Sequence, residues 1–254
     1  WSMTEPMTTW LATVHVNKFT ADLRHAPDGT PIRLYVPEGT PQSHIDGLAK
    51  AGPMLTYFET LIGRYPFRSY GSVIVKDPKL YYALETQAMS TFPEDASPPD
   101  EAFVSHELAH QWFGNSVSVA KWEDLWIAEG AATFFETWWQ HRKDRAAFDQ
   151  AMLDIYDYVV AQNLGPAVVD RPEDLFSDRT YYRGGAALYA LQLQIGDSSF
   201  FNIMKHFAQD NRGRNVTSED FIATAVRFSG DGSVRTLLEL WLYDDAVPAL
   251  PGKA

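Results

Sequence analysis

The 254-residue sequence predicts an α+β fold, in which a small mixed sheet is followed by a mainly helical lobe. Two observations support this prediction. Short segments rich in β-branched and aromatic residues, separated by Pro and Gly, occur mainly before residue 97, whereas amphipathic helical patterns dominate after it. Strands that precede the helices, instead of alternating with them, are typical of α+β domains. A hydrophobic fraction of 45% is sufficient for a sizeable core.

The strands and one helix are expected in the first part of the chain. Residues 1–40 have the composition of strands and turns. Residues 44–64 predict an amphipathic helix that Pro53 breaks or kinks, because proline lacks the amide hydrogen of the helical bond. The segment YGSVIVKDP at 70–78 predicts a strand, and YYALETQAMSTF at 81–92 predicts a strand and a loop.

The later part of the chain is expected to be mostly helical. A helix over 97–114 has an acidic pair at 100–101 that suits its start, and Gly114 suits its end. EGAATFFETWWQHRK at 129–143 predicts a second helix. TSEDFIATAVRFS at 217–229 begins with the pattern of a capping box.

Composition excludes several classes of function. The formal net charge of −12 and the lack of a basic stripe argue against nucleic acid as a partner. No apolar run approaches the roughly 20 residues of a membrane span. The chain has no cysteine, which excludes disulfides and thiolate chemistry and is compatible with any redox compartment. Because the chain begins with Trp1, we expect any targeting signal upstream of it.

One short stretch, FVSHELAHQW at 103–112, has the composition of a metal site. In a helix, positions i and i+4 lie on one face about 6 Å apart, so His106 and His110 can reach one ion. Zinc accepts neutral imidazole nitrogens, and Glu107 can take a proton from a water that the metal activates. The alternative is a core or surface helix with two histidines, because the five-residue pattern alone is suggestive and not decisive.

A third ligand is expected at Glu129. Catalytic zinc takes three protein ligands and keeps one position open. Glu129 lies 19 positions after His110, among apolar neighbours at the start of the second predicted helix. A buried carboxylate is costly without a partner, and a metal relieves that cost. The alternative is a first-turn glutamate that the helix dipole stabilises.

These motifs resemble the gluzincin pattern: His106-Glu107-x-x-His110, eighteen residues, then Glu129. The stretches HELAHQWFGNSV and WEDLWIAEG resemble those of the zinc aminopeptidases typified by membrane alanyl aminopeptidase (aminopeptidase N) and leukotriene hydrolase, and the similarity extends over about 45–245. The resemblance implies a thermolysin-like zinc metallopeptidase catalytic domain. It also implies one Zn²⁺ ion, held by the two histidines and Glu129, and peptide substrates with a free N-terminus.

The resemblance also assigns a residue to the substrate's α-amino group. Exopeptidases of this family have a Gly-x-Met-Glu-Asn strand ahead of the zinc helix, and its counterpart is the segment 82–86, Tyr-Ala-Leu-Glu-Thr, with Glu85 as the glutamate. A carboxylate that faces an ammonium group makes a charge-assisted hydrogen bond, which a blocked N-terminus cannot make. Without the resemblance, Glu85 would be interpreted as a solvated charge on an edge strand.

A tyrosine is expected to stabilise the oxyanion. The family has a Tyr-x-Lys/Arg-Gly motif after the third ligand, and this chain has Tyr181-Tyr182-Arg183-Gly184. That register makes Tyr181 the match, whereas Tyr182 would match only if Gly185 were the family glycine. The phenol would donate to the oxyanion of the tetrahedral intermediate. Two tyrosines packed at a helix start are the alternative.

The chain departs from the family pattern in two respects. Ala128 stands where many members have Asn before the third ligand, which removes a polar group near the metal. In addition, most of the family's N-terminal β domain and its C-terminal helical domain have no counterpart. We therefore expect residues 1–24 to be the last strands of a mostly absent N-terminal β domain and residues 25–254 to be the catalytic domain. In the full-length protein, the two are expected to pack against each other.

The sequence thus predicts a zinc-dependent aminopeptidase that hydrolyses the N-terminal residue from peptides. Glu107 would act as the general base, Tyr181 would stabilise the oxyanion and Glu85 would bind the free N-terminus. The alternatives are another zinc hydrolase on the same scaffold, either an endopeptidase or an epoxide hydrolase, and a catalytically inactive peptide-binding domain.

Overall fold

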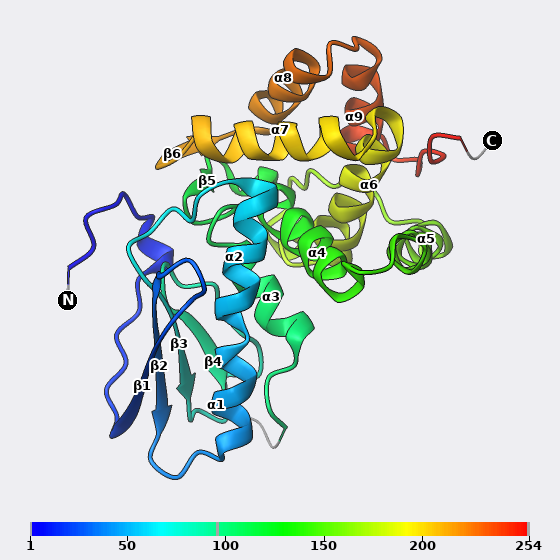
Figure 1. Cartoon of the computed structure of the whole chain (residues 1–254). Coiled ribbons are helices and arrows are strands. Elements are labelled where there is room, and N and C mark those ends of the chain that lie inside the picture. Colours follow the sequence, from blue (N-terminus) through cyan, green and yellow to red (C-terminus); the bar gives the residue numbers. More distant parts are fainter. Residues whose placement is uncertain (1, 95–96, 253–254) are drawn as a thin grey trace.

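The computed structural model describes residues 2–94 and 97–252 and has the predicted α+β architecture (Figure 1). A four-stranded sheet and the helix pair beside it form one lobe, and the remaining helices form the other. The strands are β1 (Phe19–His25), β2 (Pro31–Pro37), β3 (Tyr70–Val75), β4 (Ser90–Pro93), β5 (Val117–Val119) and β6 (Arg214–Val216). The α-helices are α1 (Gln42–Ala49), α2 (Ala51–Ile62), α3 (Glu101–Ala109), α4 (Trp126–His141), α5 (Arg145–Ala161), α6 (Gly184–Ile195), α7 (Asp197–Asp210), α8 (Ser218–Ser229) and α9 (Ser233–Tyr243).

The main sheet is mixed, as predicted. Its order is β1-β2-β3-β4, with β1 antiparallel to β2 and the other neighbours parallel. The segment 81–92 forms less regular strand than expected, because β4 begins only at Ser90. Before it, Leu84 makes a single antiparallel bridge to Thr91, with both backbone bonds at 2.8 Å. The chain that precedes β4 therefore folds back along the free edge of that strand.

The predicted helix at 44–64 is broken into α1 and α2. The break falls at Lys50, and Pro53 lies in the first turn of α2. A continuous helix would need a bond from the amide of residue 53 to the carbonyl of Ala49, and proline cannot donate it. Both helices lie beside the sheet (Figure 1); α1 packs against β2, whereas α2 packs against α3 and α7.

The helix expected over 97–114 is shorter than predicted. Asp100 caps α3 by accepting from the amide of Phe103 at 2.8 Å, as the acidic pair suggested. The helix ends at Ala109, and tight turns lead from there to Gly114, whose φ is +115°. Gly114 thus ends the following turns rather than the helix itself, since its positive φ suits a residue without a Cβ.

Helix α4 lies at the centre of the helical lobe and packs against α3, α5 and α6 (Figure 1). It begins three residues before the predicted start. Its beginning is fixed by the buried carboxylate of Asp124, which accepts from the backbone amide of Ser218 at 3.1 Å and from its hydroxyl at 2.5 Å. Ser218 is the first residue of α8, and the predicted capping box of Thr217 and Asp220 is present there.

Two glycines allow α4 and α6 to approach closely. A Cβ added to Gly130 would lie 2.7 Å from the carbonyl carbon of Gly184, and one added to Gly184 would lie 3.1 Å from the Cα of Gly130. The two backbones are therefore in contact next to Glu129. Among the helices of the described ranges, none combines the length and the apolarity needed to cross a bilayer.

We predict that Gly130→Ala will destabilise the fold. The added methyl group must push the backbone of α6 away, and overpacking of this kind costs about 1–3 kcal/mol. Urea denaturation is the measurement. Gly232→Ala is the matched control, because a Cβ there has no neighbour within 4 Å and φ is −64°. Equal unfolding free energies for the Gly130 variant and the wild type would contradict the close approach.

Candidate metal centre

Helices α3 and α4 bring the three predicted metal ligands together. The Nε2 atoms of His106 and His110 lie 3.5 Å and 3.3 Å from Oε2 of Glu129, and the three ligand atoms lie within 4.8 Å of one another. His110 and Glu129 are buried, and the side chain of His106 is 14% exposed. Two imidazoles and one carboxylate are a usual ligand set of catalytic zinc.

The other nitrogen of each imidazole has a partner that fixes the ring. Nδ1 of His110 lies 3.2 Å from the carbonyl of Phe113, which can only accept, so this nitrogen carries the proton. Nδ1 of His106 lies 3.0 Å from Oε2 of Glu136, which lies two helical turns after Glu129 on α4. Both rings therefore direct Nε2 towards Glu129, and protonation at Nδ1 leaves Nε2 as the nitrogen that can bind a metal ion.

The electrostatics of the site favour a cation. Burial opposes charge on both imidazoles, yet the Glu129 carboxylate outweighs it and raises the pKa of His106 and of His110. Burial would raise the pKa of Glu129, but the two histidines lower it to about 2. The carboxylate therefore stays ionised inside the protein and attracts positive charge, which protons or a divalent ion can supply. The residues present fit zinc.

Glu107 lies in the same site with a carboxylate oxygen that no residue satisfies. The side chain is buried, and its Oε2 has no hydrogen-bond partner in the described part of the chain. Burial raises the pKa of Glu107 to about 8, although the positive charges of His106 and His110 oppose the shift. An unpaired buried oxygen in a native structure calls for a missing partner, and water suits the position.

The Glu85 carboxyl belongs to the same cluster. Burial raises the pKa of Glu85 above its usual value. The positive charge of His110 opposes this shift and the negative charge of Glu129 adds to it, so Glu85 interacts electrostatically with both predicted ligands. Its backbone is clamped, because Nε2 of Gln111 and Nδ2 of Asn115 donate to the carbonyl of Glu85 at 3.1 Å and 2.5 Å. The interpretation of Glu85 as a solvated edge-strand charge is wrong, since the residue is 7% exposed.

The two tyrosines of the Tyr-Tyr-Arg-Gly segment point to different places. The ring of Tyr181 stacks on His106, with centroids 6.1 Å apart and an interplanar angle of 15°. Tyr182 is 37% exposed and packs edge-on against Tyr158. Burial and the negative charges of Glu129 and Glu85 raise the pKa of Tyr181 well above its usual value. Tyr181 therefore keeps its proton and can donate it in a hydrogen bond.

A cavity of about 540 Å³ opens onto the metal centre. The ligand His106, the acid Glu107 and the phenol of Tyr181 lie in its wall. Aromatic and proline side chains form much of the remaining surface: Tyr82, Pro93, Pro98, Pro99 and Phe103. Apolar walls with a few polar groups at one end are typical of a site that binds an organic substrate.

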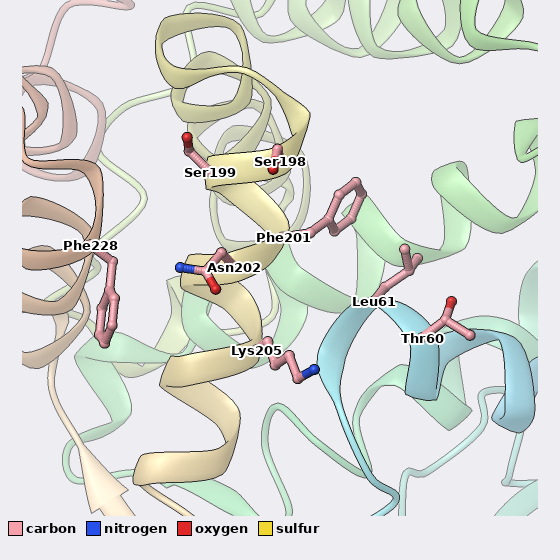
Figure 2. A pocket seen from close by; sticks show the side chains of 8 residues that line it. All are labelled: Thr60, Leu61, Ser198, Ser199, Phe201, Asn202, Lys205 and Phe228. Carbon is pink, nitrogen blue, oxygen red and sulfur yellow. The ribbon is translucent and has the colours of Figure 1, made fainter.

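A second cleft, of about 360 Å³, lies between α2, α7 and α8 (Figure 2). Its lining combines Thr60, Leu61, Phe201 and Phe228 with serine hydroxyls and the ammonium group of Lys205. None of the predicted site residues lies in this lining. The chemistry of the chain is therefore assigned to the first cavity.

Comparison with known proteins decides the family. The model of the Peptidase family M1 domain matches residues 48–241. This chain belongs to peptidase family M1. The predicted resemblance to the zinc aminopeptidases of the aminopeptidase N type is thereby confirmed.

Relatives of this M1 chain include aminopeptidase A of Gloydius brevicauda, at 26% identity, and glutamyl aminopeptidase of Homo sapiens, at 27%. Each alignment covers 96% of the chain but only 28% of the relative, so the chain spans little more than a quarter of their length. A mutant M1 zinc metallopeptidase from Deinococcus radiodurans, solved with a Tyr-Ser-Ala substrate, has a TM-score of 0.81 and 28% identity. The alignment covers 92% of this chain and 54% of the Deinococcus chain.

Sequence reasoning missed three residues that support the M1 metal centre. Glu136 orients His106, and Gln111 and Asn115 hold the backbone of Glu85. Glu136 lies seven positions after Glu129, which is two helical turns and therefore the same face of α4. That spacing was a usable signal. The two amides gave none, because their partner is a backbone carbonyl far away in the sequence.

We predict that Glu136→Ala will weaken zinc binding by about 10- to 100-fold, because loss of a partner to a ligating histidine frees the ring and lowers its basicity. Competition with a fluorescent chelator measures the affinity directly. Glu136→Gln is the control, because its amide oxygen can still accept from Nδ1 and should preserve most of the affinity. An alanine variant with wild-type affinity would show that Glu136 does not orient His106.

Proposed function

We propose that this chain is the catalytic domain of a zinc aminopeptidase, which removes the N-terminal residue from peptides. The observation that carries the proposal is the buried cluster of His106, His110 and Glu129, with an unpaired Glu107 oxygen beside it. Membership of peptidase family M1 and relatives named as aminopeptidases support the same conclusion.

The three ligands would hold one Zn²⁺ ion through two imidazole nitrogens and a carboxylate. Bound zinc supplies Lewis acidity, which lowers the pKa of a water from 15.7 to about 7 and polarises a carbonyl group. Glu107 would accept a proton from the attacking water and then deliver it to the leaving amine. Its buried oxygen without a protein partner supports this role. No covalent intermediate with the enzyme is needed.

Tyr181 would donate its phenolic proton to the oxyanion that forms on the attacked carbonyl. Its stacking on His106 and its raised pKa support the role, because a neutral phenol is a donor at physiological pH. The ring is fixed before the reaction, so the donor needs little reorganisation as charge develops. Tyr182, which packs against Tyr158, is not assigned a role in catalysis.

Glu85 would bind the free α-amino group of the substrate and so limit hydrolysis to the first peptide bond. Its burial near the metal centre and its clamped backbone support a fixed distance between the amino group and the attacked carbonyl. An ammonium group also compensates the carboxylate that burial would otherwise penalise. An endopeptidase or an epoxide hydrolase needs no such group, and this favours the aminopeptidase among the zinc hydrolases.

The domain division at residue 24 remains a proposal, with an N-terminal β domain packed against residues 25–254. Residues 1–24 are proposed to be that domain's last strands; in their described part the strand is β1, which starts at Phe19 and pairs with β2 of the main sheet. The segment runs beside the Glu85 region, because Nε2 of Gln87 donates to the carbonyl of Pro6 at 3.0 Å. Val14 and Val16 are 90% and 93% exposed, which supports a surface that another domain covers.

We predict that Glu107→Gln will retain zinc and lose nearly all turnover. The amide has a similar shape but cannot accept the proton of the attacking water, a step worth about 10²- to 10⁴-fold. Metal analysis of the purified variant and its kcat on an aminoacyl anilide are measured together. Wild-type turnover in a variant with a full complement of zinc would remove Glu107 from its role.

We predict that Glu85→Ala will lower kcat/KM for an aminoacyl anilide far more than for its N-acetylated form, because only the free amine pairs with the carboxylate. Loss of a charge-assisted bond corresponds to about 1.5–3 kcal/mol, or roughly 10- to 150-fold. Glu94→Ala, at an exposed ion pair with Lys76, serves as a control for removing one carboxylate. Equal losses on both substrates would make Glu85 a structural residue.

A further inference from the structure

The guanidinium group of Arg183 is fully buried and has an unusual set of partners. It donates to backbone carbonyl oxygens throughout, and those belong to Leu164, Leu240, Trp241, Asp244, Asp245 and Ala246. Five of these six carbonyls lie at the end of α9 or in the turn that follows it. Arg183 thus satisfies the last carbonyls of a helix whose dipole is negative at that end.

The same residue ends the π-helical turn Arg179–Arg183, which carries Tyr181. This turn continues directly into α6, whose first residue, Gly184, touches the backbone of α4 at Gly130. The turn is therefore held from two sides. On one side it is pressed against the helix of Glu129, and on the other Arg183 ties it to the end of α9, which packs on α6 (Figure 1).

We propose that Arg183 is a positioning residue for Tyr181, and that its hydrogen bonds to the end of α9 determine the direction of the phenol group. The inference rests on the proposed role of Tyr181 at the oxyanion. Single π-helical turns are rare and frequently occur at functional sites. Held by six carbonyls, the turn cannot relax into a regular α-helix, which would rotate Tyr181 away from His106.

A lysine at position 183 keeps the positive charge but loses the planar fork. Its ammonium group has three donors on a flexible stem, so it cannot reach all the carbonyls that Arg183 satisfies. The turn then gains freedom, and the phenol leaves the position of the oxyanion for part of the time. Misplacement by about 1 Å can reduce the rate by as much as 10²-fold, whereas ground-state binding of the peptide depends on other groups.

The test is a double-mutant cycle of Arg183→Lys and Tyr181→Phe in the zinc-loaded protein. We expect Arg183→Lys to lower kcat by about tenfold or more with KM changed less than about twofold. It should also weaken a phosphinic peptide, which mimics the tetrahedral oxyanion, by the same factor. In the Tyr181→Phe background, Arg183→Lys should have no further effect on either quantity, because the donor that it positions is already gone.

Leu238→Ala on α9 is the control for lost stability, since Leu238 is buried on the same helix and its carbonyl is not among those that Arg183 binds. It should lower Tm but leave kcat unchanged. Should Arg183→Lys fail to fold, Arg183→Gln, which retains an amide donor without a buried charge, replaces it in the cycle.

Three results would overturn the proposal. An equal fall in kcat in both backgrounds would make Arg183 act independently of Tyr181. An unchanged kcat with a lowered Tm would make it a purely structural residue. Wild-type kcat in Tyr181→Phe alone would remove the oxyanion role itself, so this single variant separates failure of the proposed function from failure of the inference.

Discussion

The structure depends on one costly arrangement: the carboxylate of Glu129 is buried between two imidazoles. An anion inside a protein is tolerated only when positive charge compensates it. His106 and His110 are both oriented so that their free nitrogens face this carboxylate, one through Glu136 and the other through a backbone carbonyl. The cluster therefore suits a divalent cation, which would compensate the buried carboxylate.

The rest of the fold places that cluster accurately. Helix α3 supplies His106, His110 follows its last residue, and α4 supplies both Glu129 and the acid that orients His106. Contact between Gly130 and Gly184 brings α6 against α4, so the turn that carries Tyr181 lies next to the metal ligands. Peripheral helices contribute as well, since the end of α9 holds that turn through Arg183. The residues of the candidate site come from several elements: a backbone carbonyl holds His110, a hydrogen bond to its own carbonyl holds the chain at Glu85, and the side chain of Glu136 orients His106.

Much of this was predictable, for identifiable reasons. The i, i+4 histidines and a glutamate with apolar neighbours are local patterns, so the grouping of His106, His110 and Glu129 was predictable. The α+β class and the break near Pro53 also followed from local rules. In contrast, α3 ends at Ala109 and not at Gly114, and buried turns with bonds such as Trp112 N–H to the Ala109 carbonyl replace its expected last residues. Gln111 acts on a backbone carbonyl that is distant in sequence, and no residue pattern reveals such a partner.

The most direct test of the metal centre is anomalous X-ray scattering at the zinc absorption edge from crystals of the zinc-loaded protein. The account predicts one strong peak bound by Nε2 of His106, Nε2 of His110 and the Glu129 carboxylate, at about 2.0–2.2 Å. A zinc-replete crystal in which these three side chains point apart, with the peak elsewhere or absent, would contradict it.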